Sequence, residues 1–238
     1  MLDFIGIGAQ KAGTTWIYEN LCKHPDILFP NGKEIHFWDN VNIREKNKIE
    51  DYASSFPDVT SAKQGEITPA YAFLEEEIIK EIYKINPDLK IIYSIRNPID
   101  RAWSGALMAL RRSEMEIDEA SDDWFLDHFK SKGSLKRGDY ENCLNNWSKV
   151  FPTENFLIIN FDDIANSPRS VLRNCAAHIG VDDSFIDKIS DDELSTKIYA
   201  GLKHPQRKKI QKKLQKIYMN KIESGKKHPL LKEVFKDF

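Results

Sequence analysis

A segment near the start of the chain has the residue types of a phosphate-binding loop. Residues 8–15 read GAQKAGTT and follow a short apolar run, Phe4 to Gly8. They open a segment with helical spacing, and the first turn of a helix carries unpaired backbone N–H groups and partial positive charge. Glycines let an anion approach the backbone, Lys11 adds a full charge, and Thr14 and Thr15 add hydroxyl donors. The pattern predicts a cradle for a phosphate group.

This loop differs from a Walker A loop. In that motif the lysine stands directly before Ser or Thr, after the last glycine. Here Lys11 comes two residues before Gly13, and Thr14 follows the glycine directly. The lysine is therefore expected to reach the phosphate from the other limb of the loop. Taken alone, the segment also fits an ordinary strand-to-helix turn with an exposed lysine.

A second candidate phosphate site follows the most apolar strand of the chain. Residues 91–95 read IIYSI, and Arg96 comes directly after them, where open parallel sheets bind ligands. Ser104 lies two turns into the next helix, away from its apolar stripe. Arginine binds phosphate oxygens in bidentate fashion, so Arg96 and Ser104 make a plausible clamp. Two such junctions on one sheet indicate a ligand with two separate phosphate groups.

Strands and helices alternate along the chain, which is typical of an α/β fold with a parallel sheet flanked by helices in three layers. Apolar runs predict buried strands, and periodic segments predict helices, one of them capped by Asn97. No repeat or linker divides the chain, so we expect a single domain over residues 1–238. The predicted strands are 4–8, 64–67, 91–95 and 156–160, and the predicted helices include 14–23, 75–83, 123–130, 140–150, 171–179 and 206–221.

Composition excludes several classes of protein. A hydrophobic fraction of 41% and a charged fraction of 30% are typical of a globular domain, and no apolar run approaches the roughly 20 residues of a membrane span. The three cysteines, Cys22, Cys143 and Cys175, lack metal-ligand spacing, so we expect buried or semi-buried thiols, no metal and a reducing compartment. No secretory signal is visible, and we expect a cytoplasmic protein.

The charge is uneven along the chain. The net charge is −2, but residues 201–238 hold 12 Lys and Arg against 3 Asp and Glu. A basic C-terminal segment suggests an anionic ligand nearby, although a solvated helix face explains most of these lysines equally well. Nothing in the sequence indicates an oligomeric state.

With both phosphate motifs in place, the sequence resembles the sulfotransferases that use 3′-phosphoadenosine-5′-phosphosulfate (PAPS). Residues 7–15 resemble their 5′-phosphosulfate loop, and residues 95–104 their 3′-phosphate motif. The likeness is greatest to the heparan sulfate N- and O-sulfotransferase branch and its bacterial relatives. Five further segments resemble that branch, in its order: 21–26 (LCKHPD), 33–38 (KEIHFW), 66–71 (EITPAY), 138–151 and 201–205 (GLKHP).

The resemblance implies a P-loop NTPase-like sulfotransferase fold, PAPS as co-substrate and specific roles for several residues. It implies that Lys11 stabilises the leaving group, that Glu34 is the general base, and that His36 orients the acceptor or is itself the base. A carboxylate fits the role of general base if burial raises its pKa towards neutrality. The residues implied to bind the nucleotide are Gln10, Lys11, Ala12, Gly13, Thr14 and Thr15 in the first loop, Arg96 and Ser104 at the second site, and Lys203 in the late loop.

The acceptor is less defined than the co-substrate. The family often has Lys where this chain has Ile67 and Arg where it has Leu202, and a cysteine pair of secreted members is missing. We expect the acceptor to be a hydroxyl or amine of a carbohydrate or small molecule, and expect no nucleic acid partner. Two rival functions remain open at this point. One is a P-loop kinase-like phosphotransferase, for which Asp162 and Asp163 can supply the metal-binding acid, and the other is a non-catalytic polyanion-binding module.

Overall fold

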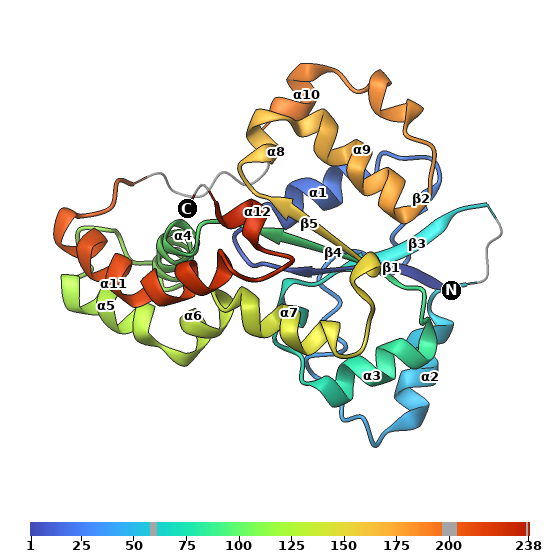
Figure 1. Cartoon of the computed structure of the whole chain (residues 1–238), viewed down its shortest axis with the longest axis horizontal. Helices are drawn as coiled ribbons and strands as arrows, with labels where there is room; N and C mark the ends of the chain where they lie inside the picture. Colours follow the sequence, from blue (N-terminus) through green and yellow to red (C-terminus); the bar gives the residue numbers. More distant parts are fainter. Residues whose placement is uncertain (58–60, 197–203, 237) are drawn as a thin grey trace.

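A five-stranded parallel sheet forms the centre of the protein (Figure 1). The computed structural model describes residues 1–57, 61–196, 204–236 and 238. The strand order is β2-β3-β1-β4-β5, and every neighbouring pair is parallel. The strands are β1 (Leu2–Gly8), β2 (Ile27–Leu28), β3 (Lys63–Ile67), β4 (Lys90–Ile95) and β5 (Phe156–Asn160).

Helices cover both faces of this sheet and complete the three predicted layers. Because successive strand residues point to opposite faces, the sheet contributes to two apolar cores. Phe4 and Ile92 pack with one group of helices, whereas Ile5 and Ile91 pack with the other. The first group comprises α1 (Thr14–Leu21), α8 (Asp163–Asn166), α9 (Pro168–Ile179) and α10 (Asp191–Ser195), with the short 3-10 helix η3 (Ser184–Lys188).

The second group is larger and extends beyond the sheet. Figure 1 shows α4, α5, α6 and α11 gathered on the side to which β4 and β5 point. The carboxyl ends of the strands therefore face this group. Its helices are α2 (Lys46–Ser54), α3 (Glu76–Ile85), α4 (Pro98–Arg112), α5 (Asp122–Lys130), α6 (Lys132–Arg137), α7 (Tyr140–Ser148), α11 (Lys208–Gly225) and α12 (Lys232–Phe235), with the 3-10 helices η1 (Pro69–Phe73) and η2 (Thr153–Asn155).

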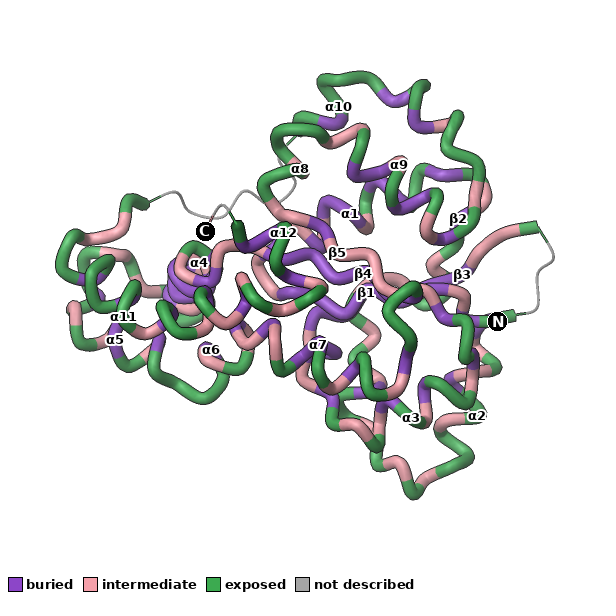
Figure 2. Tube along the Cα trace, viewed as in Figure 1, coloured by how far each residue is buried: buried purple, intermediate pink, exposed green. Residues whose placement is uncertain are grey.

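The predicted strands and helices are confirmed to within a few residues. Buried residues concentrate along β1 and β4, as their continuous apolar runs predict (Figure 2). Asn97 caps α4, its side chain accepting a hydrogen bond of 2.9 Å from the backbone N–H of Ile99. The short strand β2 lies in a segment for which the sequence analysis predicts no strand.

The structure tests the expected burial of the cysteines and the expected exposure of the C-terminal lysines. Cys143 and Cys175 are buried as expected, but the expectation for Cys22 was wrong, because this thiol lies exposed at the end of α1. The lysines of α11 form a solvated helix face, since Lys212, Lys213 and Lys216 are all exposed.

No helix in the described part of the chain is long and apolar enough to cross a membrane, and the expected cytoplasmic location stays a prediction.

Candidate functional site

The loop between β1 and α1 has the backbone conformation of an anion cradle. Lys11 and Gly13 both lie in the left-handed region, with φ of 71° and 80°. Gly13 is the N-cap residue of α1, and a Cβ at this position would overlap the side chain of Ile164. No side chain among the described residues caps α1, so the N–H groups of Thr14 and Thr15 keep their capacity to bind an anion.

The two predicted phosphate sites are in direct contact. Arg96 Nη1 donates a hydrogen bond of 3.3 Å to the carbonyl of Lys11. Two residues earlier, Ser94 Oγ donates to the carbonyl of Ala12 at 2.5 Å, and the carbonyl of Ser94 accepts from the N–H of Ala9 at 2.7 Å. The neighbouring strands β1 and β4 therefore bring Lys11 and Arg96 to one edge of the sheet, close enough to contact one nucleotide.

Arg96 is held in place from several directions. Its guanidinium lies 4.4 Å from the centre of the Phe161 ring, and its carbonyl accepts a hydrogen bond of 2.8 Å from Tyr140. Burial lowers the pKa of Arg96. The pKa of Lys11 is also lowered, first by burial and then by the nearby Arg96, Arg112 and Arg111. These cations repel one another, so an anion bound between them is favoured electrostatically.

Ser104 lies on α4, half-buried, one residue after Trp103. The indole Nε1 of Trp103 donates a hydrogen bond of 2.8 Å to the carbonyl of His204. Lys203, the predicted late-loop ligand, lies outside the described residues, so its contact with the nucleotide stays a prediction.

Segment 33–40, which carries the candidate base, is attached to the same edge of the sheet. The N–H of Glu34 donates a hydrogen bond of 3.0 Å to the carbonyl of Ile67, the last residue of β3. Glu34 Oε2 lies 3.8 Å from His36 Nε2, and His36 Nδ1 lies 2.8 Å from Asp39 Oδ2. Glu34 also contacts the ammonium of Lys33. The three side chains form a row, Glu34–His36–Asp39, in which Asp39 was missed by the sequence analysis.

The environment of Glu34 differs from the expectation. Its side chain is 47% exposed, so the condition of burial is not met in this structure. Glu34 and His36 both lie exposed on segment 33–40. Both residues have positive φ, 60° and 56°, which is uncommon for residues other than glycine and is found where surrounding contacts fix the backbone.

Segment 33–40 is connected through hydrogen bonds to the buried carboxyl group of Glu66. Tyr71 Oη accepts hydrogen bonds from the N–H groups of Phe37 at 3.1 Å and Trp38 at 3.4 Å. The same hydroxyl donates to Glu66 Oε2 at 3.2 Å, which Thr68 Oγ1 also contacts at 3.0 Å. Glu66 is fully buried, and burial raises its pKa to about 7. The Tyr71–Glu66 pair therefore connects segment 33–40 to the core.

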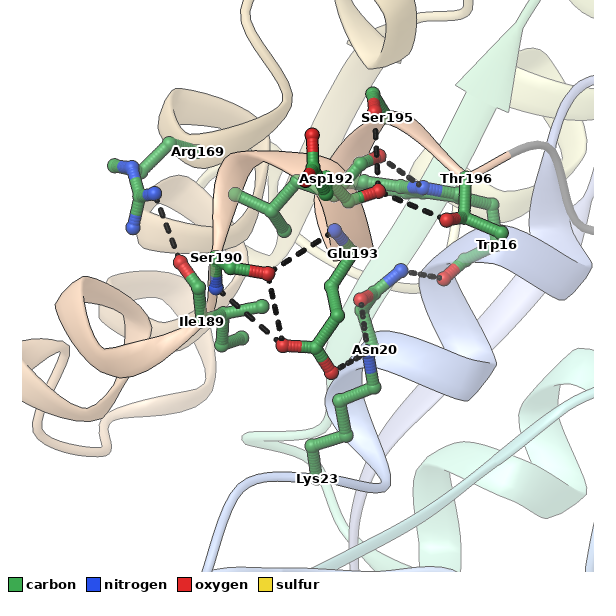
Figure 3. A network of polar contacts seen from close by, with 11 residues as sticks. Trp16, Asn20, Lys23, Arg169, Ile189, Ser190, Asp192, Glu193, Ser195 and Thr196 are labelled. Atoms are coloured by element: carbon green, nitrogen blue, oxygen red, sulfur yellow. Dashed lines mark hydrogen bonds and ion pairs between the residues drawn. The ribbon is translucent and has the colours of Figure 1, made fainter.

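Helix α1 is held along one side by a polar network that includes residues of α9 and α10 (Figure 3). Trp16 Nε1 donates a hydrogen bond of 3.1 Å to the carbonyl of Leu194, and Lys23 Nζ lies 3.5 Å from Glu193 Oε1. Ser190 and Glu193 form a capping box at the start of α10. Arg169 of α9 donates to the carbonyl of Ile189 at 2.9 Å. These contacts set the direction in which the N-terminus of α1 points.

Gln10 and Ala12, the remaining predicted ligands of the first loop, have different surroundings. Ala12 is buried, its N–H donates to the carbonyl of Ala9 at 3.1 Å, and its carbonyl accepts from Ser94 Oγ. Gln10 lines a pocket formed by α4, α5 and α6. Their contacts with a nucleotide stay predictions, as do those of Thr14 and Thr15.

Comparisons with known proteins agree with this geometry. Residues 2–237 match the family model described as "Sulfotransferase domain". The chain is 30% identical over 174 residues to mouse heparan sulfate glucosamine 3-O-sulfotransferase 5, a match that covers 68% of this chain and 48% of that protein. It is also 30% identical over 196 residues to mouse bifunctional heparan sulfate N-deacetylase/N-sulfotransferase 4, with 75% and 22% covered. The chain thus spans about half or less of the length of these relatives.

Two solved structures extend the comparison to the fold. A sulfotransferase from Alicyclobacillus acidocaldarius superposes with a TM-score of 0.71 at 25% identity, covering 94% of this chain and 93% of that one. The mouse sulfotransferase SULT7A1, complexed with PAP, superposes with a TM-score of 0.60 at 18% identity, covering 100% and 89%. The second likeness concerns the fold alone. The family match over nearly the whole chain, on a fold that joins the two predicted phosphate sites, places this protein in the sulfotransferase domain family.

Proposed function

We propose that this protein transfers a sulfuryl group from PAPS to a hydroxyl or amine of a carbohydrate or small molecule. The observation that carries the proposal is the contact between the two phosphate sites, in which Arg96 donates to the carbonyl of Lys11. A nucleotide with phosphate groups at both its 3′ and 5′ positions needs two cationic sites at a fixed separation. The relatives support the proposal, because their names describe sulfotransferases, one of them solved with PAP.

The proposed reaction is an in-line displacement at sulfur. The acceptor oxygen or nitrogen forms a bond to sulfur while the bond from sulfur to the oxygen of the 5′-phosphate breaks. Adenosine 3′,5′-bisphosphate leaves with the electron pair of that bond, and the acceptor loses a proton to the Glu34–His36 pair. Catalysis of this kind rests on positioning and on stabilising the charge that develops on the leaving group.

The residues divide this work between them. Lys11 and the first turn of α1 hold the 5′-phosphate and stabilise the negative charge of the leaving oxygen. Arg96 and Ser104 hold the 3′-phosphate. Segment 33–40 presents Glu34 and His36 at the same edge of the sheet, where either can accept the proton of the acceptor.

The test uses two charge-removing variants with separate readouts. Arg96→Ala should weaken binding of adenosine 3′,5′-bisphosphate by about 10- to 100-fold, because a hydrogen bond to a charged group contributes about 1.5–3 kcal/mol. It should change binding of adenosine 5′-monophosphate much less, since that ligand lacks the 3′-phosphate. Lys11→Ala should abolish PAPS-dependent transfer while the thermal unfolding midpoint stays close to that of the unmodified protein.

The controls separate this proposal from its rivals. Lys188→Ala removes one exposed positive charge remote from the site and should leave binding and transfer unchanged. Isothermal titration with ATP and Mg²⁺, and with an oligonucleotide, should show weaker binding than with adenosine 3′,5′-bisphosphate. Equal loss of both adenosine ligands in Arg96→Ala, or preferred binding of ATP with Mg²⁺, contradicts the proposal.

A further inference from the structure

A cationic pocket lies next to the first phosphate loop. It has a volume of about 150 Å³, is open to solvent on one side and is lined mainly by α4, α5 and α6. An engineered protein cavity of this order of volume holds a benzene molecule, so the pocket has room for a compact group. Its lining contains no Asp or Glu among the described residues. The charged and amide side chains in the lining are Gln10, Arg101, Arg112, His128 and Arg137.

Arg101 is the innermost of these side chains. It is only 1% exposed, and its Nη2 donates a hydrogen bond of 3.0 Å to the carbonyl of Ser134. Its Nε is buried and has no hydrogen-bond partner in the part of the chain that the structure describes. A buried guanidinium is costly unless it is paired and fully hydrogen-bonded. Arg101 therefore brings a buried and incompletely hydrogen-bonded positive charge to the wall of the pocket, and this charge favours an anion there.

The neighbouring arginines add to this positive charge. Burial, and then Arg101 and Arg112, lower the pKa of Arg137. Burial, and then Arg101 and Arg137, lower the pKa of His128, which favours its neutral form at pH 7. None of the three arginines forms an ion pair with a carboxylate of residues 1–57, 61–196, 204–236 or 238. Three guanidinium groups thus share one small space without a counter-ion from the described protein.

The pocket adjoins the reacting centre. Gln10, which lines it, is the neighbour of Lys11 in the first loop. Arg112, which also lines it, is close enough to lower the pKa of Lys11. A molecule that presents a nucleophile to PAPS beside Lys11 can therefore place a second group in the pocket. The two phosphate groups of the nucleotide are already assigned to the first loop and to Arg96 with Ser104.

We infer that this pocket binds a compact anionic group of the acceptor, a carboxylate, sulfate or phosphate, and that the acceptor is consequently an acidic molecule. The inference rests on the proposed function and narrows its acceptor. Arginine forks match the oxygens of all three groups in bidentate fashion. A neutral acceptor would leave the positive charge of the three guanidinium groups without a counter-ion from the described residues and would bind more weakly.

The experiment measures binding in protein saturated with adenosine 3′,5′-bisphosphate, so that both phosphate sites are filled. Sodium sulfate and sodium glucuronate are titrated at constant ionic strength, and the thermal unfolding midpoint is followed. We expect saturable stabilisation by both anions, competition between them, and no effect of glucose. Arg137→Gln should weaken the binding of both anions at least 10-fold. Arg112→Gln, at the exposed edge of the pocket, should weaken it by a similar factor.

Lys130→Gln is the matched control, because it removes one exposed positive charge at the end of α5 outside the pocket lining. It should bind both anions as the unmodified protein does. Equal weakening in Lys130→Gln and Arg137→Gln would mean a diffuse charge effect and would overturn the inference. Binding of sulfate alone, without glucuronate, would mean a site for inorganic anions and would overturn it as well.

The outcomes also distinguish this inference from the proposed function. Tight binding of adenosine 3′,5′-bisphosphate without any Arg137-dependent anion binding overturns the inference and leaves the function in place. Absence of nucleotide binding overturns the function, and with it the assignment of the pocket to an acceptor.

Discussion

At the scale of single residues, the row Glu34–His36–Asp39 defines the choice of general base. Asp39 Oδ2 lies 2.8 Å from His36 Nδ1. If that nitrogen carries the proton, Nε2 is left as an acceptor directed towards Glu34, 3.8 Å away. Either group can then accept the acceptor's proton, Glu34 directly or His36 with Asp39 as its orienting partner.

Replacement of the carboxylate tests this choice. Glu34→Gln should lower kcat for PAPS-dependent transfer by about 10²- to 10⁴-fold, the usual contribution of a general base. Its affinity for adenosine 3′,5′-bisphosphate should be unchanged, because Lys11 and Arg96 remain. Steady-state kinetics and isothermal titration on the same preparation measure the two quantities.

The outcome also locates the base if it is not Glu34. Glu50→Gln, at an exposed position of α2, is the control and should keep full activity. An unchanged kcat in Glu34→Gln together with a large loss in His36→Asn would assign the proton to His36. A loss of nucleotide affinity in Glu34→Gln would show instead that segment 33–40 contacts the nucleotide.

At the scale of elements, the position of segment 33–40 depends on η1 and β3. Tyr71 lies on η1, accepts from the N–H groups of Phe37 and Trp38, and donates to Glu66 on β3. These N–H groups have no other hydrogen-bond partner among the described residues. The segment that carries the candidate base is thus fixed by this hydroxyl group together with the fully buried side chain of Trp38.

Removal of that hydroxyl should change catalysis more than nucleotide binding. Tyr71→Phe leaves two N–H groups unpaired, at a cost of about 1–3 kcal/mol for each group that stays buried. We expect a lower free energy of unfolding and a kcat at least 10-fold lower, with little change in affinity for adenosine 3′,5′-bisphosphate. Urea denaturation, kinetics and titration measure the three effects.

Tyr83→Phe is the matched control, since Tyr83 is 39% exposed on α3 and distant from segment 33–40 in the sequence. It should change none of the three quantities by more than the error of measurement. If Tyr71→Phe lost stability but kept kcat, the hydroxyl would have a role in folding only.

At the scale of the whole molecule, the sequence predicts those strands and helices whose positions are determined by local residue patterns. Continuous apolar runs identify β1 and β4, and the cap of α4 follows from Asn97 and Pro98. The contact of Lys11 with Arg96 was expected because both follow parallel strands of one sheet. Helix α6 was missed because it is six residues long, and α2 because only Tyr52 on it is buried.

The features that sequence reasoning could not supply depend on packing between distant segments. The charge of Arg101 gives no sign that this side chain is buried, since burial requires Ser134 and Tyr218 from other helices. The pocket that it lines exists only where three helices meet. Glu34 is exposed whereas Glu66 is fully buried, and this difference likewise follows from the position of segment 33–40 next to β3.

The burial of Glu66 has a consequence for the stability of the whole molecule. Burial raises its pKa from 4.5 to about 7, so the folded protein holds this proton more tightly than the unfolded chain does. Between these two pH values the folded state binds more protons, and the free energy of unfolding must therefore fall as the pH rises. The difference corresponds to about 3 kcal/mol, present in full below pH 4.5 and lost above pH 7.

Glu66→Gln removes this titration and should flatten the dependence on pH. The free energy of unfolding of the unmodified protein minus that of Glu66→Gln should decrease from pH 5 to pH 8, measured by urea denaturation at each pH. All other titrating groups are shared, so they cancel in the difference. Glu50→Gln should give a nearly constant difference over the same range. A constant difference for Glu66→Gln too would mean that this carboxyl is already ionised in the folded protein at pH 5, as it is in the unfolded chain, contrary to its burial in the core.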